Sequence, residues 1–130
     1  MAKKIRLGII GAGGATWAQR AHFPALAHSP DFEVTAVCTT KPESAEAARQ
    51  KYGAKLAFHD FRKIAASPDI DAVAVVVRVP SHYDPTKAAL EAGKHVYTEW
   101  PLGRTTAEGV ELAALAKAKG VQTAVGLQSR

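Results

Sequence analysis

The sequence predicts a doubly wound α/β domain, in which a parallel sheet of six strands carries helices on both faces. Short runs rich in valine and isoleucine alternate with segments of helical pattern, which is typical of strand–helix–strand units. The first run, Ile5 to Ile10, leads directly into the glycine-rich turn Gly11-Ala12-Gly13-Gly14. No internal repeat, linker or low-complexity tract interrupts the 130 residues. We therefore expect residues 1–130 to form one domain with a single core.

The expected strands are the apolar runs that lie between turn-forming residues. Valine and isoleucine suit strands that are buried on both faces of a parallel sheet. The runs cover Arg6 to Ile10, Glu33 to Cys38, Lys55 to Phe58, Ala72 to Val77, His95 to Thr98 and Gln122 to Val125. Six strands are enough for a complete doubly wound sheet.

Proline and glycine mark the first two helices. Pro24 lies inside the first helical pattern, where a missing N–H is expected to shorten or kink the helix. Pro42 suits the first turn of a second helix that runs to about Tyr52. Gly53 lies just beyond that helix and favours its termination.

Two further helices carry comparable signals. One is expected to run from about Asp84 and to end before Gly93. The other follows Thr105, which together with Glu108 has the spacing of a capping box, and reaches Lys119 before another glycine. Both helices therefore precede expected strands, as a parallel sheet requires.

The glycine-rich turn is the main functional signal. Closely spaced glycines between a strand and a helix bring backbone N–H groups against a dinucleotide pyrophosphate, and the helix N-terminus adds partial positive charge. The usual third glycine is replaced by Thr16, so the helix is expected to start slightly displaced. The alternative is a tight turn without a ligand. The residues expected to contact the cofactor here are Gly11, Gly13, Gly14, Ala15, Thr16 and Trp17.

The loop after the second strand bears on the choice of cofactor. NAD sites commonly place an acidic residue there, whereas this chain has Thr39, Thr40 and Lys41. Two hydroxyl donors and an ammonium could bind the 2′-phosphate of NADP, so we expect NADP to be preferred over NAD. The alternative is a solvated loop that precedes the helix.

Composition excludes several other classes. The single cysteine, Cys38, allows no intramolecular disulfide or cysteine metal cluster, and we expect no metal site. The net charge of +5 is spread along the chain, without a zinc-finger or RNA-binding motif, so nucleic acid is not an expected partner. No apolar run approaches the roughly 20 residues of a membrane span, and no signal peptide precedes Ile5. A soluble, cytoplasmic protein is expected.

Several stretches together resemble the N-terminal Rossmann domain of the Gfo/Idh/MocA oxidoreductases. They are the glycine turn, AHFPAL at Ala21 to Leu26, AALEAGKHVYTEWPLG at Ala88 to Gly103, and the final GVQTAVGLQSR. The resemblance covers nearly the whole chain. It implies an NAD(P)-dependent oxidoreductase that transfers hydride between a nicotinamide cofactor and a sugar or polyol.

The resemblance also implies a missing part. In the family a larger α/β domain follows the Rossmann domain and carries much of the substrate pocket, whereas this chain stops at Arg130. An isolated cofactor domain is expected to be weakly active or inactive. Surface that the second domain would cover is expected to be exposed, which favours a homo-oligomer.

One motif departs from the family pattern. Members usually have Glu-Lys-Pro after the fifth strand, with the lysine near the nicotinamide, whereas this chain has Glu99-Trp100-Pro101. An indole has no titratable proton, so Trp100 cannot replace that lysine as an acid or base. No catalytic residue is assigned with certainty, although His82 could transfer a proton. The further expected cofactor contacts are Val79, Pro80, His82, Glu99 and Trp100.

The same departure points to a particular subgroup. GGATWA at the first turn, VPSHYD at Val79 to Asp84, and the Glu99-Trp100 pair resemble the subgroup that contains the fungal galactose-pathway inhibitor protein. That protein binds dinucleotide but regulates transcription through protein partners. Three classes therefore stay open: an oxidoreductase cofactor domain, a dinucleotide-responsive regulator without catalysis, and a folded remnant that binds nothing tightly.

Overall fold

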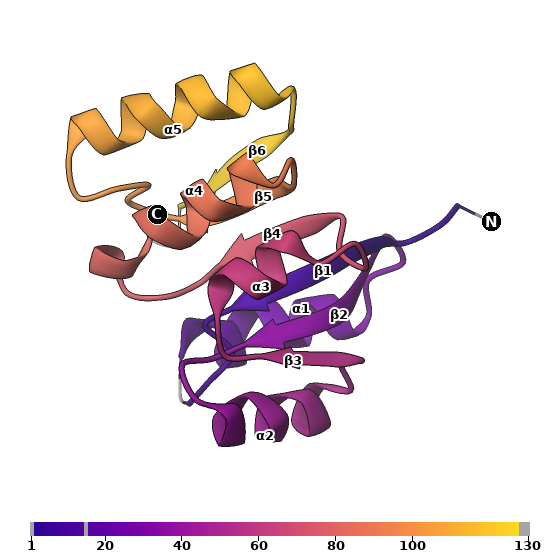
Figure 1. The fold of residues 1–130 in the computed structure, drawn as a ribbon. Coiled ribbons are helices and arrows are strands. Elements are labelled where there is room, and N and C mark those ends of the chain that lie inside the picture. The colour runs from indigo at the N-terminus through magenta and orange to yellow at the C-terminus, as the bar shows by residue number, and fades with distance from the viewer. Residues whose placement is uncertain (1, 15, 128–130) are drawn as a thin grey trace.

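The computed structural model describes residues 2–14 and 16–127 and shows one sheet of six parallel strands (Figure 1). The strand order is β3-β2-β1-β4-β5-β6, with helices on both faces. This order is that of the doubly wound dinucleotide-binding fold, and it confirms the predicted fold class. The strands are β1 (Ile5–Ile10), β2 (Phe32–Cys38), β3 (Leu56–Phe58), β4 (Ala72–Val75), β5 (His95–Glu99) and β6 (Thr123–Gly126).

The helices alternate with these strands. Those on one face are the π-helical turn η1 (Ala18–His22), α1 (Phe23–Ala27) and α2 (Pro42–Tyr52). Those on the other face are α3 (Phe61–Ala66), α4 (Tyr83–Glu91), preceded by the 3₁₀ turn η2 (Val79–Ser81), and α5 (Thr106–Lys119). None of the described helices is long and apolar enough to span a membrane.

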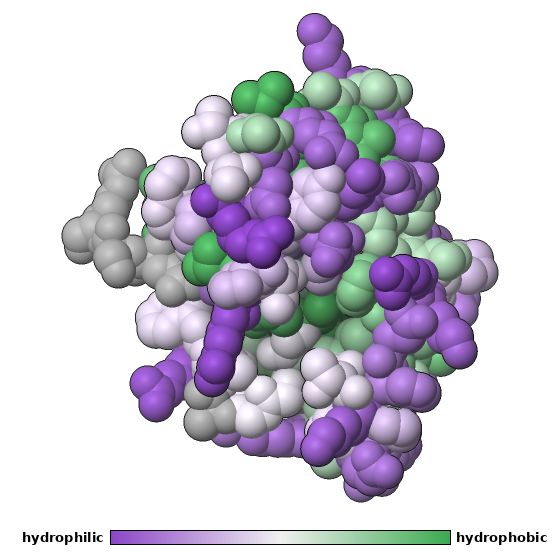
Figure 2. All heavy atoms as spheres, turned by 60° about the vertical axis from the view of Figure 1, so that its left-hand side comes forward, coloured by the Kyte–Doolittle hydropathy of each residue, from purple (hydrophilic) through white to green (hydrophobic). Residues whose placement is uncertain are grey.

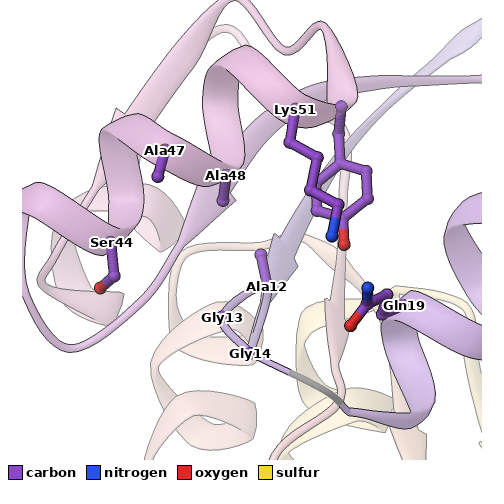
Figure 3. A pocket seen from close by; sticks show the side chains of 9 residues that line it. Ala12, Gly13, Gly14, Gln19, Ser44, Ala47, Ala48 and Lys51 are labelled. Carbon is purple, nitrogen blue, oxygen red and sulfur yellow. The ribbon is translucent and has the colours of Figure 1, made fainter.

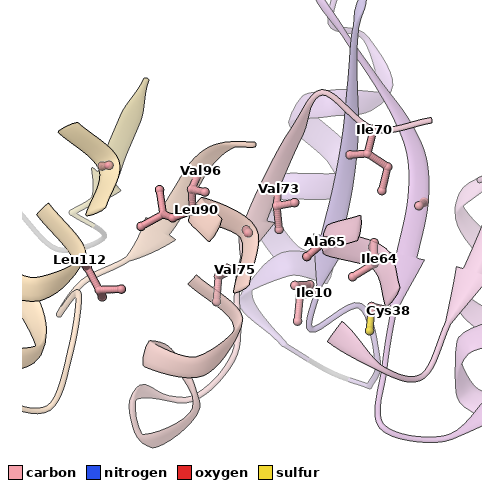
Figure 4. Close-up of a cluster of buried hydrophobic side chains, with 13 residues drawn as sticks. Ile10, Cys38, Ile64, Ala65, Ile70, Val73, Val75, Leu90, Val96 and Leu112 are labelled. Carbon is pink, nitrogen blue, oxygen red and sulfur yellow. The ribbon is translucent and has the colours of Figure 1, made fainter. Parts of the chain in front are cut away.

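The core lies in two apolar layers, one on each face of the sheet. Side chains from β1, β4, α3, α4 and α5 meet in the first layer, which includes Ile10, Val75 and Leu90 (Figure 4). Ile9 and Val37 belong to the second layer, which α1 and α2 cover. Alternate residues of β1 thus enter opposite layers, because successive side chains of a strand point to opposite faces.

The central strand β4 is shorter than the sequence predicted. It ends at Val75, because the chain leaves the sheet after the amide of Val76 donates to the carbonyl oxygen of Ile10 at 2.9 Å. The predicted strand continued to Val77, whose apolar side chain packs against the first core layer from the loop. At Val76 and Val77 the apolar pattern therefore indicates burial and not strand pairing.

Pro24 changes the first helix, as expected, but through a π turn. Proline has no N–H to donate to the carbonyl four residues earlier. The amide of Phe23 reaches back five residues to the carbonyl of Ala18, and regular α-helix follows only from Phe23 onward. The buried Phe23 ring stacks on Tyr52 of α2 with the ring centroids 3.5 Å apart.

The predicted helix ends are confirmed, and one helix was not predicted. Gly53 and Gly120 end α2 and α5 with φ of 68° and 65°. The Thr105 hydroxyl accepts the amide of Glu108 at 3.2 Å, as the capping pattern predicted. The additional helix, α3, has only six residues, too few for a clear helical pattern, although Asp60 caps its first turn.

The amino-terminal edge of the sheet is held by charged side chains. The guanidinium of Arg6 in β1 forms a bidentate salt bridge with Asp71, which precedes β4. Its Nη2 donates to Oδ1 at 2.8 Å and its Nε donates to Oδ2 at 3.1 Å. Lys94, from the Ala-Gly-Lys-His stretch, donates to the carbonyl oxygens of Ser67 and Ile70, both at 2.7 Å. These contacts lie at the edge opposite the glycine turn, so this lysine supports the fold and is remote from the site.

Candidate functional site

A cleft of about 990 Å³ opens at the carboxyl ends of the strands. β1 pairs with β2 on one side and with β4 on the other, so the strand order reverses at this point. Doubly wound sheets bind their ligands at such a reversal. The elements that line the cleft are the glycine turn, the ends of β2 and β4, and the first residues of α3 and α4. Figure 2 shows one face of the molecule, on which most residues are hydrophilic and apolar residues are visible in the hollows between them.

Two of the backbone amides in the glycine turn are paired, and two have no acceptor among the described residues. The amides of Gly11 and Ala12 both donate to the carbonyl of Cys38, at 3.0 and 3.2 Å. The amides of Gly13 and Gly14 have no acceptor within the described part of the chain. Gly11 has φ of +104°, and a Cβ there would overlap the carbonyl oxygen of Val76. Only glycine therefore allows this close approach of the turn to β4.

Thr16 supports a ligand at the same turn. Its hydroxyl oxygen is buried and finds no partner in residues 2–14 and 16–127, and Thr16 lines the cleft. Buried polar atoms in native proteins are nearly always paired, so an orphaned one is explained by a ligand or water. A pyrophosphate oxygen would accept from this hydroxyl and from the two free amides. The residues present thus fit a dinucleotide pyrophosphate; Ala15, also predicted to contact it, lies outside the described residues.

The Gln19 side chain links the glycine turn to helix α2. With its amide nitrogen toward the turn, Gln19 donates to the carbonyl of Gly14 at 2.9 Å and accepts from the Lys51 ammonium at 2.8 Å. Figure 3 shows the two side chains pointing toward each other across a smaller cavity of about 360 Å³. Because Lys51 belongs to α2, this chain of contacts ties the glycine turn to the neighbouring helix.

The loop after β2 is partly occupied by its own hydrogen bonds. The hydroxyls of Thr39 and Ser44 lie 2.6 Å apart, and each lies within about 3.1 Å of the Lys41 carbonyl oxygen. Thr39 and Thr40 line the cleft. Lys41 does not line it and stands exposed at the N-cap position of α2. The structure thus places the two threonines, but not the lysine, at the cleft.

The cations that line the cleft come from elsewhere. Arg62 and Lys63 lie in the first turn of α3, and Arg78 lies after β4. Sequence reasoning missed all three, because α3 itself was not expected and scattered basic residues carry no spacing signal. The cleft is also lined by Asp60 and Asp84. Asp60 accepts the amide of Arg62 at 2.9 Å, so its carboxylate is already engaged.

His82 is buried between two loops of this edge. Its Nε2 lies 2.7 Å from the carbonyl oxygen of Val77, and its Nδ1 lies 2.7 Å from that of Pro101, which follows a cis peptide bond. Since carbonyl oxygens only accept, both contacts are hydrogen bonds at once only when both ring nitrogens carry protons. The side chain thus joins the loop after β4 to the loop after β5. Pro80 lines the cleft, whereas Val79 does not.

Glu99 lies at the carboxyl end of β5, on the far side of β4 from the loop after β2. It is buried, and its Oε1 lies 2.7 Å from Nε2 of His22. Sequence reasoning missed this pair, because nothing in the local pattern links two residues 77 positions apart. The His22 ring also packs edge-on against Tyr97 at 5.5 Å. The structure therefore ties η1 to β5 through a polar pair.

Two tryptophans expose their rings on the surface. Trp17 is 45% exposed and precedes η1, and Trp100 is 63% exposed and follows β5. Neither lines the cleft that the glycine turn borders. They are large apolar surfaces available for contact.

Cys38 ends β2 and lines the cleft without being a reactive group. Burial raises the pKa of its thiol to about 12, with a smaller contribution from the charge of Asp60. The thiol is therefore protonated at neutral pH and is a poor nucleophile. Among the described residues, no group of His, Cys, Asp and Glu side chains could hold a metal ion.

Residues 5–127 match the family described as "Oxidoreductase family, NAD-binding Rossmann fold". The chain belongs to the Gfo/Idh/MocA family. Its curated relatives include the dehydrogenase aclE of Aspergillus oryzae, which is 39% identical over 100% of this chain and 37% of its own length. The galactose/lactose metabolism regulatory protein GAL80 of Saccharomyces cerevisiae is 32% identical over 99% of this chain and 32% of its own length. The chain thus spans about a third of these Gfo/Idh/MocA relatives.

Solved structures of the family share the fold. KijD10, a 3-ketoreductase from Actinomadura kijaniata, was crystallised with NADP and TDP-benzene. It matches 95% of this chain and 37% of its own, with a TM-score of 0.88 and 31% identity. An NAD-binding oxidoreductase from Klebsiella pneumoniae matches 95% of this chain and 34% of its own, with a TM-score of 0.85 and 30% identity. These Gfo/Idh/MocA structures confirm the resemblance found in the sequence.

Proposed function

We propose that the chain binds a nicotinamide dinucleotide, with NADP(H) preferred over NAD(H), as the cofactor domain of a sugar or polyol oxidoreductase. One observation carries this proposal: Gly13 and Gly14, whose amides have no acceptor within residues 2–14 and 16–127, and Thr16, with its buried hydroxyl, line a cleft at the strand-order reversal. Family membership supports the same ligand class.

The chain's own residues have binding and positioning roles in this proposal. The nicotinamide supplies the hydride when the cofactor is bound. The glycine turn and Thr16 hold the pyrophosphate, while the predicted contacts Thr39 and Thr40 border the adenosine side of the cleft. Glu99 and Trp100 lie at the end of β5, where the family places its nicotinamide-side motif.

Hydride transfer by this chain alone is expected to be weak or absent. Trp100 offers one N–H and no titratable proton for a substrate oxygen. Transfer also requires donor and acceptor to be held in near-attack geometry with water excluded, and a cleft on one domain supplies binding more readily than enclosure. A sugar-like substrate and a cytoplasmic location remain part of the proposal.

Calorimetric titration with NADPH, NADH and their oxidised forms tests the binding step. We expect micromolar binding of at least one form at fixed salt. A Gly13→Asp variant is the negative control: its carboxylate would lie at the turn and repel the negatively charged pyrophosphate, so it should not bind. If none of the four cofactor forms binds, the proposal is overturned, and a folded remnant that binds no ligand tightly is favoured instead.

A dinucleotide-responsive regulator is the second candidate. Trp100 in place of the family's lysine and the 32% identity to GAL80 favour it. Consumption of reduced nicotinamide when a keto sugar is added, followed by absorbance, would favour the oxidoreductase. Because little turnover is expected from this chain alone, the regulator is tested separately: it requires a protein partner whose affinity for the chain changes when dinucleotide is added.

A further inference from the structure

The loop after β4 lies directly against the glycine turn. β4 pairs with β1, and the amide of Val76 donates to the carbonyl oxygen of Ile10 at 2.9 Å. A Cβ on Gly11 would overlap the carbonyl oxygen of Val76, so the two backbones are in contact. Arg78 follows two residues later, and its Cα lies at most about 7.6 Å from that of Val76. The Arg78 side chain therefore begins close to the glycine turn.

The backbone of Arg78 is held in place, whereas its side chain has no partner among the described residues. The carbonyl oxygen of Val77 lies 2.7 Å from Nε2 of His82, and the carbonyl oxygen of Arg78 accepts the amide of Ser81 at 2.8 Å. Within residues 2–14 and 16–127, the Arg78 guanidinium makes no ion pair and no hydrogen bond. It is exposed and lines the cleft. Five N–H donors are thus available there from a fixed backbone.

The glycine turn contributes neutral donors to the same cleft. The amides of Gly13 and Gly14 have no acceptor within the described part of the chain, and the buried Thr16 hydroxyl oxygen has no partner there. An orphaned buried hydroxyl points to a ligand or a water at this place. These groups can donate hydrogen bonds to an anion but carry no net charge to balance it. A cation beside the turn would supply that charge.

The other charged side chains that line the cleft are paired or more distant. Lys63 lies in α3, which follows β3, and three strand spacings of about 4.8 Å separate β3 from β4, or about 14 Å in all. The Arg62 guanidinium lies 3.9 Å from a carboxylate oxygen of Asp60. The Asp84 carboxylate lies in the first turn of α4, where the helix N-terminus favours negative charge. Of these cations, Arg78 is the one that comes from a strand next to β1.

We propose that Arg78 binds the dinucleotide pyrophosphate from the β4 side, through the phosphate of the nicotinamide half. This inference rests on the proposed dinucleotide function and adds the charge that the glycine turn lacks. The adenosine side of the cleft lies at the end of β2, and β4 lies on the opposite side of β1. A guanidinium offers two parallel N–H donors to phosphate oxygens. Because NADPH and NADH share this phosphate, Arg78 stabilises both complexes equally.

Titration calorimetry of the chain tests the assignment with two variants, Arg78→Met and Lys63→Met. They remove one positive charge each from different parts of the same cleft, so Lys63→Met is the matched control. Each protein is titrated with NADPH, with NADH and with ADP-ribose, which keeps both phosphates but lacks the nicotinamide. Thermal unfolding confirms that both variants fold, as expected because both side chains are exposed.

We expect Arg78→Met to weaken NADPH, NADH and ADP-ribose by one common factor of about tenfold, since a charge-assisted hydrogen bond is lost. Lys63→Met should weaken NADH and ADP-ribose less than threefold, because its charge is remote from the pyrophosphate.

Four results would overturn the inference while leaving dinucleotide binding intact. A loss in Arg78→Met that is confined to NADPH would assign the side chain to the 2′-phosphate. A loss that spares ADP-ribose would assign it to the nicotinamide. An equal loss of NADH affinity in Lys63→Met would indicate general attraction by the cleft, and unchanged affinities in Arg78→Met would exclude a contact. Wild-type protein that binds none of the three ligands would overturn the proposed function as well.

Discussion

His82 shows how one side chain holds the functional edge together. Its ring is 1% exposed and contacts carbonyl oxygens from the loops after β4 and β5. The sequence marked it as a cofactor contact or proton donor, because a histidine after a central strand suits both roles. In the structure both ring nitrogens face backbone oxygens, so the contact that the side chain makes is with the protein's own loops.

Replacing His82 by leucine tests this role. Leucine has no N–H, so the carbonyl oxygen that accepts from the ring, that of Val77 or that of Pro101, would lose its donor in a buried place, which costs roughly 1–3 kcal/mol. We expect the free energy of unfolding to fall by about 1–3 kcal/mol, measured by urea denaturation. His28→Leu, at an exposed position, should change it by less than about 0.5 kcal/mol. A neutral effect of His82→Leu would contradict the assigned contacts.

At the scale of elements, the glycine turn depends on helix α2 as well as on its own sequence. Gln19 donates to the Gly14 carbonyl and accepts from Lys51, so the turn is supported by a side chain from η1 and a side chain from α2. Neither Gln19 nor Lys51 belongs to the glycine motif. The orientation of the glycine turn therefore depends on how η1 and α2 pack beside it.

A Gln19→Glu substitution separates the two contacts of Gln19. The carboxylate keeps an acceptor for Lys51 but has no N–H for the Gly14 carbonyl, and its charge lies near the pyrophosphate position. We expect dinucleotide affinity to fall about tenfold with the melting temperature nearly unchanged. Gln50→Glu, on the exposed side of α2, is the control. An affinity equal to wild type would exclude Gln19 from positioning the turn.

The pairing of β1 with β4 carries a pH-dependent contribution. Hydrogen bonds from the Arg6 side chain lower the pKa of Asp71 from 3.8 to about 2. Because the folded-state pKa is depressed, this stabilisation is fully present above the ordinary pKa of the carboxyl and is lost as the pH falls from about 4 toward 2. Unfolding midpoints of wild type and Asp71→Asn, measured between pH 7 and 2, should converge at the acid end. Parallel curves would contradict the linkage.

At the scale of the whole molecule, one end of the domain is less covered than the rest. α5 packs against α4, yet Val110 is 64% exposed, and beside the edge strand β6 Leu127 is 59% exposed. Figure 1 shows α5 and β6 together at one end of the sheet, away from α2. Exposed apolar surface of this kind commonly marks an interaction site.

The predicted homo-oligomer is tested at this surface. If self-association covers it, light scattering should give a mass above one chain that falls on dilution. Val110→Lys with Leu127→Lys should return the mass to that of a monomer, whereas Lys117→Met should not change it. A monomer mass at every concentration would contradict the prediction.

The fold was predictable because its determinants are local. Strand runs of valine and isoleucine, Pro42 and Gly53 around α2, and Thr105 before α5 each act through neighbouring residues. The glycine turn was predictable for the same reason. The end of β4 was misplaced, since an apolar residue such as Val77 packs equally well from a loop.

By itself, the sequence determined the fold class, the family and the edge of the sheet at which a ligand would bind, because spacing along the chain encodes strands, helices and turns. Only the tertiary structure decided that His22 meets Glu99, that His82 joins two loops, and that Lys63 and Arg78 rather than Lys41 face the cleft. Those contacts join residues far apart in the chain, and their partners are chosen by how the helices pack on the sheet.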